Sequence, residues 1–159
     1  MYGSDGKPGW FLKLNPAGTV PVLATNDDDE IYPDSELILD YIKESSRLHG
    51  QDKGIDETKV QSWRETVSRE IIPIGKRAVL GGSPHDLFEL LKRIDDDVDG
   101  PYLCGDCITV ADCAAFPFLW RIDNEFGLES GSKLKDWLDL CSDTSCFKKT
   151  IQGAWWWWW

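Results

Sequence analysis

The sequence predicts an α+β and all-α protein, in which a small α/β region is followed by an all-helical domain. Two observations lead to this fold class. Turn residues and short β-like runs alternate over the first 50 residues, and apolar residues then recur at helical spacing. The balance of 42% hydrophobic and 28% charged residues is that of a folded globular chain. We therefore expect two structural regions, residues 1–50 and 51–154, and exclude the five tryptophans at 155–159 from the fold.

The first region has the signals of a β-hairpin followed by one helix. Residues 15–18 (Asn-Pro-Ala-Gly) predict a turn, and strands are expected over 20–24 and 30–32. The short polar loop between the strands favours antiparallel pairing. Asp34 or Ser35 is then expected to cap a helix. The predicted buried face of this helix consists of Leu37, Ile38, Tyr41 and Ile42.

The second region has helical periodicity throughout. Apolar residues from Val60 to Ile71 repeat at helical spacing, and Pro73 is expected to kink or end that helix. The acidic run 95–97 is expected to be a solvated face or turn. Further helices are expected over residues 87–94, 109–126, 134–140 and 146–151.

Charge and cysteine content restrict the class of protein. Seventeen basic residues against 28 acidic ones give a net charge of -11, which disfavours nucleic acid as a partner. The first 14 residues show no secretory signal, and no apolar run is long enough to span a bilayer. The five cysteines are an odd number and are scattered, which indicates reduced thiols. We expect the protein in the cytoplasm or in an organelle stroma.

Residues 7–23 carry a long motif, Lys-Pro-Gly-Trp-Phe-Leu-Lys-Leu-Asn-Pro-Ala-Gly-Thr-Val-Pro-Val-Leu. It resembles the segment of cytosolic glutathione transferases that leads into the third strand of their thioredoxin-like domain, in particular the omega and dehydroascorbate reductase branches. The resemblance implies a truncated thioredoxin-like part and a cis bond before Pro21. It also implies that the backbone N–H and C=O of Val20 pair with bound glutathione as one more strand.

Three further residues resemble the family's contacts to glutathione. Asp34 and Ser35 are similar to the acid and serine that open the next helix and hold the γ-glutamyl end, where a helix N-terminus favours a carboxylate. Lys7 resembles a lysine that pairs with the glycyl carboxylate. Taken singly, the Asp-Ser pair is explained as a helix cap and Lys7 as a surface charge. Their order along the chain with Val20 and Pro21 favours a glutathione site.

Residues 100–118 resemble the buried helix of the family's C-terminal domain and its approach. Thr109 and Asp112 form a predicted capping box of the Thr-x-x-acid type, with a structural role. Loss of such a cap typically costs about 1 kcal/mol of stability. The resemblance therefore implies an all-helical glutathione transferase domain, and together the two matched regions extend over nearly the whole chain.

Other chemistry-bearing residues give weaker signals. Cys104 and Cys107 form a Cys-x-x-Cys pair, but no second ligand pair with zinc spacing accompanies it, and such redox pairs normally begin a helix beside a strand. His49 and His85 are isolated, which is typical of surface or capping histidines. We expect no metal site.

Three functions remain open from the sequence. In complete family members a strand, a helix and another strand precede the matched region and hold the catalytic Ser, Tyr or Cys, whereas six residues precede Lys7. The first function is a transferase or glutathione-dependent reductase, with glutathione as co-substrate and a small electrophile or oxidised substrate. The second is a non-catalytic binding module. The third is a structural subunit that dimerises or docks into a larger complex, as an exposed sheet edge and the tryptophan tail would favour.

Overall fold

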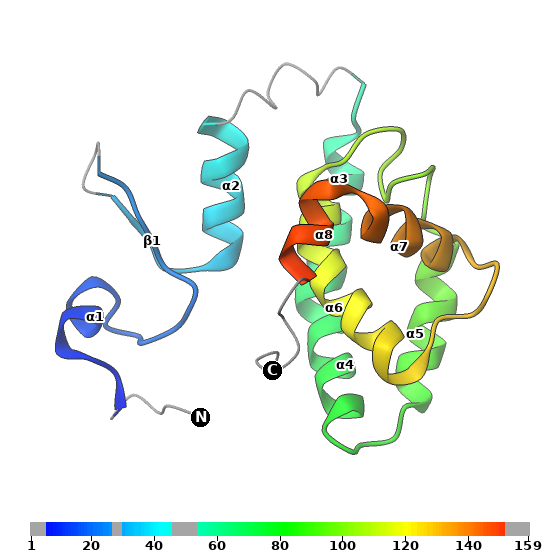
Figure 1. Cartoon of the computed structure of the whole chain (residues 1–159), viewed down its shortest axis with the longest axis horizontal. Helices are drawn as coiled ribbons and strands as arrows, with labels where there is room; N and C mark the ends of the chain where they lie inside the picture. Colours follow the sequence, from blue (N-terminus) through cyan, green and yellow to red (C-terminus); the bar gives the residue numbers. More distant parts are fainter. Residues whose placement is uncertain (1–5, 27–29, 46–53, 152–159) are drawn as a thin grey trace. The chain divides into compact units, whose positions relative to one another are not determined.

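The computed structural model describes residues 6–26, 30–45 and 54–151, in two compact units. The N-terminal unit is Met1–Lys53 and the helical unit is Gly54–Trp159 (Figure 1). The predicted region boundary after residue 50, His49, most of the loop between the two strands and the tryptophan tail lie outside the described residues.

The N-terminal unit contains a two-stranded antiparallel sheet and two helices. Leu23 pairs with Tyr32 and Ala24 with Ile31, which confirms the predicted antiparallel hairpin. Tyr41, one turn and a half into the second helix, stacks against Tyr32 with ring centroids 4.7 Å apart. The elements in chain order are α1 Gly9–Leu14, β1 Leu23–Ala24, β2 Ile31–Tyr32 and α2 Ser35–Ser45.

Helix α1 was not expected from the sequence. It begins directly after Pro8, whose carbonyl accepts hydrogen bonds from the N–H groups of Phe11 (2.9 Å) and Leu12 (3.2 Å). The fixed φ of proline suits the start of a helix, since its missing N–H is not needed there. This segment of six residues is too short to show a clear helical period. The helix could therefore not be predicted from the sequence pattern alone.

Two predictions for the N-terminal unit were wrong in detail. Strand β1 is shorter than the predicted strand over 20–24, because Pro21 has no N–H to give to a ladder. The predicted buried face of α2 is only partly covered, since Leu37 and Ile42 remain 48% and 44% exposed. Within the described residues, a two-stranded sheet is too narrow to cover the whole apolar side of the helix.

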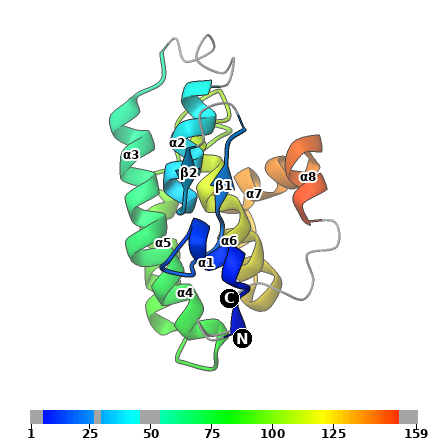
Figure 2. The same ribbon diagram turned by 90° about the vertical axis from the view of Figure 1, so that its left-hand side faces the viewer.

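The helical unit contains the helices that the periodicity predicted, packed around a buried α6. Figures 1 and 2 show α3 and α4 following one another along one axis, and both contact α6. No helix among the described residues is long and apolar enough to cross a membrane. The elements are α3 Glu57–Thr66, the π-helical segment η3 Val67–Ile71, α4 Ile72–Val79, α5 His85–Asp95, α6 Val110–Phe126, α7 Lys133–Asp143 and α8 Ser145–Ile151.

Of the two outcomes expected of Pro73, a kink or an end of the helix, the end does not occur, because the preceding turn widens. The N–H of Ile72 bonds to the carbonyl of Val67, five residues back, and α4 continues directly from η3. A proline inside an α-helix lacks one donor and its ring presses on the carbonyl four residues back. The wider π turn relieves that contact, so the helix passes through the proline.

Asp95 has a bonding role that its acidic run did not suggest. Its Oδ1 accepts the backbone N–H of Leu134 at 2.8 Å, at the start of α7. Lys133 donates from Nζ to the carbonyl oxygens of Asp96 (3.3 Å) and Val98 (3.2 Å). The expected solvated face or turn holds for Asp96 and Asp97, which are exposed in a turn, but not for Asp95, whose carboxylate joins the end of α5 to α7.

Candidate functional site

The five residues expected to contact glutathione all lie in the N-terminal unit, on two segments that a hydrogen bond holds together. The Thr19 hydroxyl donates to the carbonyl oxygen of Pro33 at 3.3 Å. Thr19 precedes Val20, and Pro33 precedes Asp34. The bond therefore brings the Val20–Pro21 peptide beside the start of α2, although 14 residues separate them in sequence.

Asn15 builds the turn that presents Val20. It is almost completely buried, at 3% exposure. Its Nδ2 donates to the carbonyl and hydroxyl oxygens of Thr19, both at 2.9 Å, and its Oδ1 accepts the N–H of Ala17 at 3.1 Å. The sequence analysis recognised a turn here but missed this role. The signal was present, because asparagine before Pro-x-Gly is typical of side-chain bonding within a turn.

The peptide bond between Val20 and Pro21 is cis, as the family resemblance implied. Val20 is 72% exposed, and its N–H and C=O form no backbone hydrogen bond within the described residues. The ladder of β1 begins only at Leu23. Val20 thus offers an unpaired donor and an unpaired acceptor on the segment before β1, which is what the pairing of an added peptide requires.

The start of α2 provides the second half of the candidate site. Asp34 Oδ1 accepts the N–H of Glu36 at 2.8 Å, so Asp34 caps the helix. Its other carboxylate oxygen has no hydrogen-bond partner among the described residues, and the same holds for the exposed hydroxyl of Ser35. The capping role is therefore real, and it leaves one oxygen and one hydroxyl available to a ligand.

Lys7 is held in place by Phe11 and Gly18. Its Nζ lies 5.7 Å from the centroid of the Phe11 ring, within the range of a cation–π contact. Gly18 has a φ of +68°, and a methyl carbon added there would lie 3.5 Å from Lys7 Cδ and 3.7 Å from Nζ. The ammonium group thus lies against the turn that leads to Val20, and no described residue forms an ion pair with it. Sequence analysis found Lys7 but missed Phe11.

This set of groups suits a ligand that is peptide-like and charged at both ends. A helix N-terminus with a free hydroxyl favours a carboxylate, and the acidic Asp34 favours an ammonium group beside it. Lys7 favours a second carboxylate, and Val20 a peptide group between the two ends. The described residues contain no group of three potential metal ligands.

In the helical unit, Asp112 organises a buried polar cluster. The capping box is present: Thr109 N donates to Asp112 Oδ2 at 2.7 Å, and the Thr109 side chain accepts the N–H of Ala111. Asp112 Oδ1 additionally accepts the N–H of Leu103 (3.0 Å) and the indole Nε1–H of Trp137 (2.9 Å). One fully buried carboxylate therefore joins α6, α7 and the loop before α6, a structural function wider than a cap.

The Cys-x-x-Cys pair does not resemble a reactive dithiol in the structure. Cys104 is buried and Cys107 is exposed, and both are free thiols. Burial, reinforced by the charge of Asp112, raises the pKa of the Cys104 thiol to about 11. Reactive cysteines have lowered pKa values, so this environment disfavours a redox function.

Both units match models of known protein families. The model of the "Glutathione S-transferase, N-terminal domain" matches residues 2–45, and that of the "Glutathione S-transferase, C-terminal domain" matches residues 86–140.

Two plant relatives are similar to the chain. The "Probable glutathione S-transferase DHAR4" of Arabidopsis thaliana is 25% identical over 91% of this chain and 71% of its own length. The "Probable glutathione S-transferase DHAR1, cytosolic" of Oryza sativa subsp. japonica is 29% identical over 74% of this chain. The chain thus spans about half, 55%, of the length of this second relative.

Solved structures show the same fold. Glutathione transferase Omega 3C from Trametes versicolor is 25% identical and superposes with a TM-score of 0.74, over 91% of this chain and 72% of that one. A glutathione transferase homolog from Lodderomyces elongisporus, crystallised with two GSH per subunit, has a TM-score of 0.71 at 22% identity, over 92% and 81%.

Proposed function

Because this chain belongs to the glutathione S-transferase family, we propose that it binds glutathione at the site formed by Lys7, Val20, Pro21, Asp34 and Ser35. One observation carries the proposal. The Thr19 bond to Pro33 brings the free backbone groups of Val20 beside the start of α2, where an oxygen of Asp34 and the hydroxyl of Ser35 are unengaged.

Each end of glutathione has a matching group in this site. The γ-glutamyl carboxylate meets the start of α2 and the Ser35 hydroxyl, and the γ-glutamyl ammonium meets Asp34. The cysteinyl peptide pairs with the N–H and C=O of Val20. The glycyl carboxylate meets Lys7, whose ammonium Phe11 keeps near the turn.

The reaction that we propose is transfer or reduction with glutathione as co-substrate. The second substrate is a small electrophile, or an oxidised molecule such as dehydroascorbate or a disulfide, as the resemblance to the dehydroascorbate reductase branch implies. Either reaction requires the glutathione thiol, or an enzyme thiol, as thiolate. We assign no nucleophile among the described residues, and no metal participates in the proposal.

A structural or interaction subunit is the second candidate function, and the exposed apolar side chains of the N-terminal unit favour it. Trp10 is 65% exposed, and several apolar neighbours in the unit are also uncovered. A homodimer, or docking into a larger complex, would cover them. Size-exclusion chromatography tests this alternative, since a stable monomer would contradict it. For either function we propose a location in the cytoplasm or an organelle stroma.

Calorimetry of glutathione binding tests the main proposal. We expect Ser35→Ala to weaken binding about fivefold and Asp34→Ala about tenfold or more, from the loss of one neutral and one charge-assisted hydrogen bond. Asp34→Asn separates capping from binding, because asparagine is an equally good helix cap but carries no charge. It should keep the stability of the protein and lose affinity as Asp34→Ala does.

A variant of Lys7 tests the contact to the glycyl carboxylate, and a variant of Asp106 is its control. Lys7→Met should weaken glutathione binding but leave γ-glutamylcysteine, which has no glycyl carboxylate, unaffected. Asp106→Asn on an exposed loop of the helical unit is the control for overall charge and should leave both affinities unchanged. Absence of binding at millimolar glutathione would sink the proposal and favour the interaction subunit.

A further inference from the structure

A groove of about 480 Å³ lies in the helical unit, between α5 and the segment that joins α6 to α7. Its volume is within the usual range of small-molecule sites. None of its lining residues belongs to the N-terminal unit, so glutathione does not account for it. The residues that carry the argument are Phe88, Glu89, Lys92, Phe126, Leu128 and Glu129.

Two aromatic rings form one wall of the groove. Phe88 and Phe126 meet edge to face, with centroids 6.3 Å apart and ring planes at 89°. Phe88 is 46% exposed, while the neighbouring floor residues Leu91 and Leu134 are buried. The groove therefore offers a ring face and edge to solvent above an apolar floor, which suits a flat apolar body.

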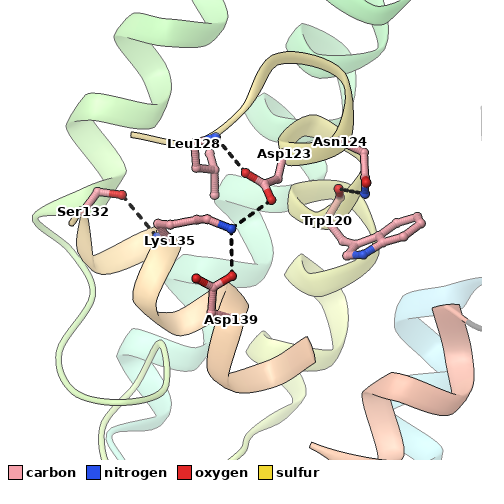
Figure 3. A network of polar contacts seen from close by, with 7 residues as sticks. All are labelled: Trp120, Asp123, Asn124, Leu128, Ser132, Lys135 and Asp139. Carbon is pink, nitrogen blue, oxygen red and sulfur yellow. Dashed lines mark hydrogen bonds and ion pairs between the residues drawn. The ribbon is translucent and has the colours of Figure 1, made fainter. Parts of the chain in front are cut away.

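The polar network of Figure 3 holds the segment after α6, which also lines the groove. Asp123 Oδ1 accepts the N–H of Leu128 at 2.8 Å, just after Gly127, the residue that caps the end of α6 with a φ of +74°. Lys135 then bridges Asp123 (3.2 Å) and Asp139 (2.7 Å). The backbone of Leu128, a lining residue, is thereby fixed by Asp123, so this part of the groove is formed without a ligand.

The charge of the groove selects for cations. Glu89, Asp95 and Glu129 line it against one lysine, Lys92. Asp95 is occupied by the Leu134 N–H, whereas Glu89 and Glu129 form no ion pair within the part of the chain that the structure describes. The net charge of -11 adds a long-range attraction for cations.

We propose that this groove is a second ligand site, which binds an organic ammonium ion with a fused-ring aromatic body. The rings of Phe88 and Phe126 contact the aromatic body, and the carboxylates of Glu89 and Glu129 receive the ammonium group. An aromatic carboxylate of the same shape is disfavoured by the same two acids. This site is independent of glutathione, because it is built by the helical unit alone.

Saturation-transfer NMR and chemical-shift titration with matched probes test the proposal. The probes are 2-(1-naphthyl)ethylammonium, 3-(1-naphthyl)propionate and the neutral 2-(1-naphthyl)ethanol. We expect the cation to bind about tenfold more tightly than the anion at low salt, with the alcohol between them, and the preference to shrink at high salt. Equal binding of the three probes, or tighter binding of the anion, would overturn the proposal.

Variants locate the probe on the molecule. Glu89→Gln combined with Glu129→Gln should weaken cation binding about fivefold or more, and Phe88→Ala should weaken all three probes. The matched control is the pair Asp106→Asn and Asp143→Asn, which removes the same charge from exposed positions outside the groove. Equal losses in the two double variants, or displacement of the probe by glutathione, would place the cation elsewhere and contradict the proposal.

Discussion

The N-terminal unit and the helical unit differ in where they bury their side chains. Every buried hydrophobic residue of the described part lies in the helical unit, from Val60 to Phe147. In the described part of the N-terminal unit, only Asn15 and Gly18 are buried. Burial of apolar surface is the main source of stability, so the helical unit carries most of the folding free energy.

The difference explains why the candidate glutathione site lies where it does. Backbone groups that must pair with a ligand have to remain unpaired in the free protein, as those of Val20 do. A tightly packed core cannot contain such groups without a large cost. The N-terminal unit therefore relies on turns and caps for its local shape, and the helical unit on a conventional core.

The largest expected effect concerns Cys141, in the core of the helical unit. Burial, with a smaller contribution from Asp112, raises the pKa of its thiol from 9.0 to about 12. At pH 8 the folded protein then holds about a thousandfold less of this thiolate than an ordinary thiol would. Mass spectrometry after iodoacetamide treatment should show the exposed Cys107 and Cys146 modified first and Cys141 last.

The same pKa predicts a pH dependence of stability. In the unfolded chain the thiol of Cys141 ionises near pH 9, whereas in the folded protein it does so near pH 12. Below pH 9 the thiol has no effect on the free energy of unfolding, and from pH 9 to pH 12 that free energy falls. Alkylation of Cys141 as fast as Cys107 at pH 8 would show that the helical core opens easily. It would contradict the view that the helical unit is the more tightly packed of the two.

Replacement of Asp112 by alanine should have the next largest effect. It leaves the Leu103 N–H and the Trp137 indole N–H buried without partners, and it removes the acceptor of the Thr109 N–H in the capping box. We expect a loss of about 3 kcal/mol in urea unfolding. Thr109→Ala, which removes the cap alone, should cost about 1 kcal/mol. Equal losses in the two variants would mean that Asp112 acts only as a cap.

A smaller effect on stability than that of Asp112→Ala is expected from Asn15→Ala in the N-terminal unit. The variant leaves the Thr19 carbonyl and the Ala17 N–H without partners, at a cost of about 1 to 2 kcal/mol within that unit. Glutathione affinity should nevertheless fall clearly, because the turn no longer presents Val20. Hydrogen exchange of residues 15–21 measures the local stability of the turn, and calorimetry measures the affinity for glutathione. Unchanged affinity would show that the turn does not position the site.

Much of the helical unit could be predicted from the sequence, because its helices are long and strongly periodic. The spacing from Val60 to Ile71 and the capping box at Thr109 each involve neighbours within a few turns, which a sequence shows directly. The hairpin and the helix after Asp34 were likewise local signals. Short elements such as α1 were missed because six residues are too few to show a helical period.

The candidate glutathione residues were found by resemblance, and the contacts that position them were not. Phe11 beneath Lys7, Asn15 across its turn, and the Thr19 bond to Pro33 all join residues that no periodicity relates. The groove beside Phe88 likewise depends on how α5 lies against the loop after α6.

By itself, the sequence indicated the family, the order of the hairpin and of the longer helices, and the candidate residues for binding glutathione. These follow from local patterns and from motif order along the chain. The tertiary structure alone decided that Pro73 is accommodated by a π turn, that Asp95 and Asp112 join separate helices, and that Val20 lies beside the start of α2. Each of these depends on distances between residues far apart in sequence, which only the packing of the chain sets.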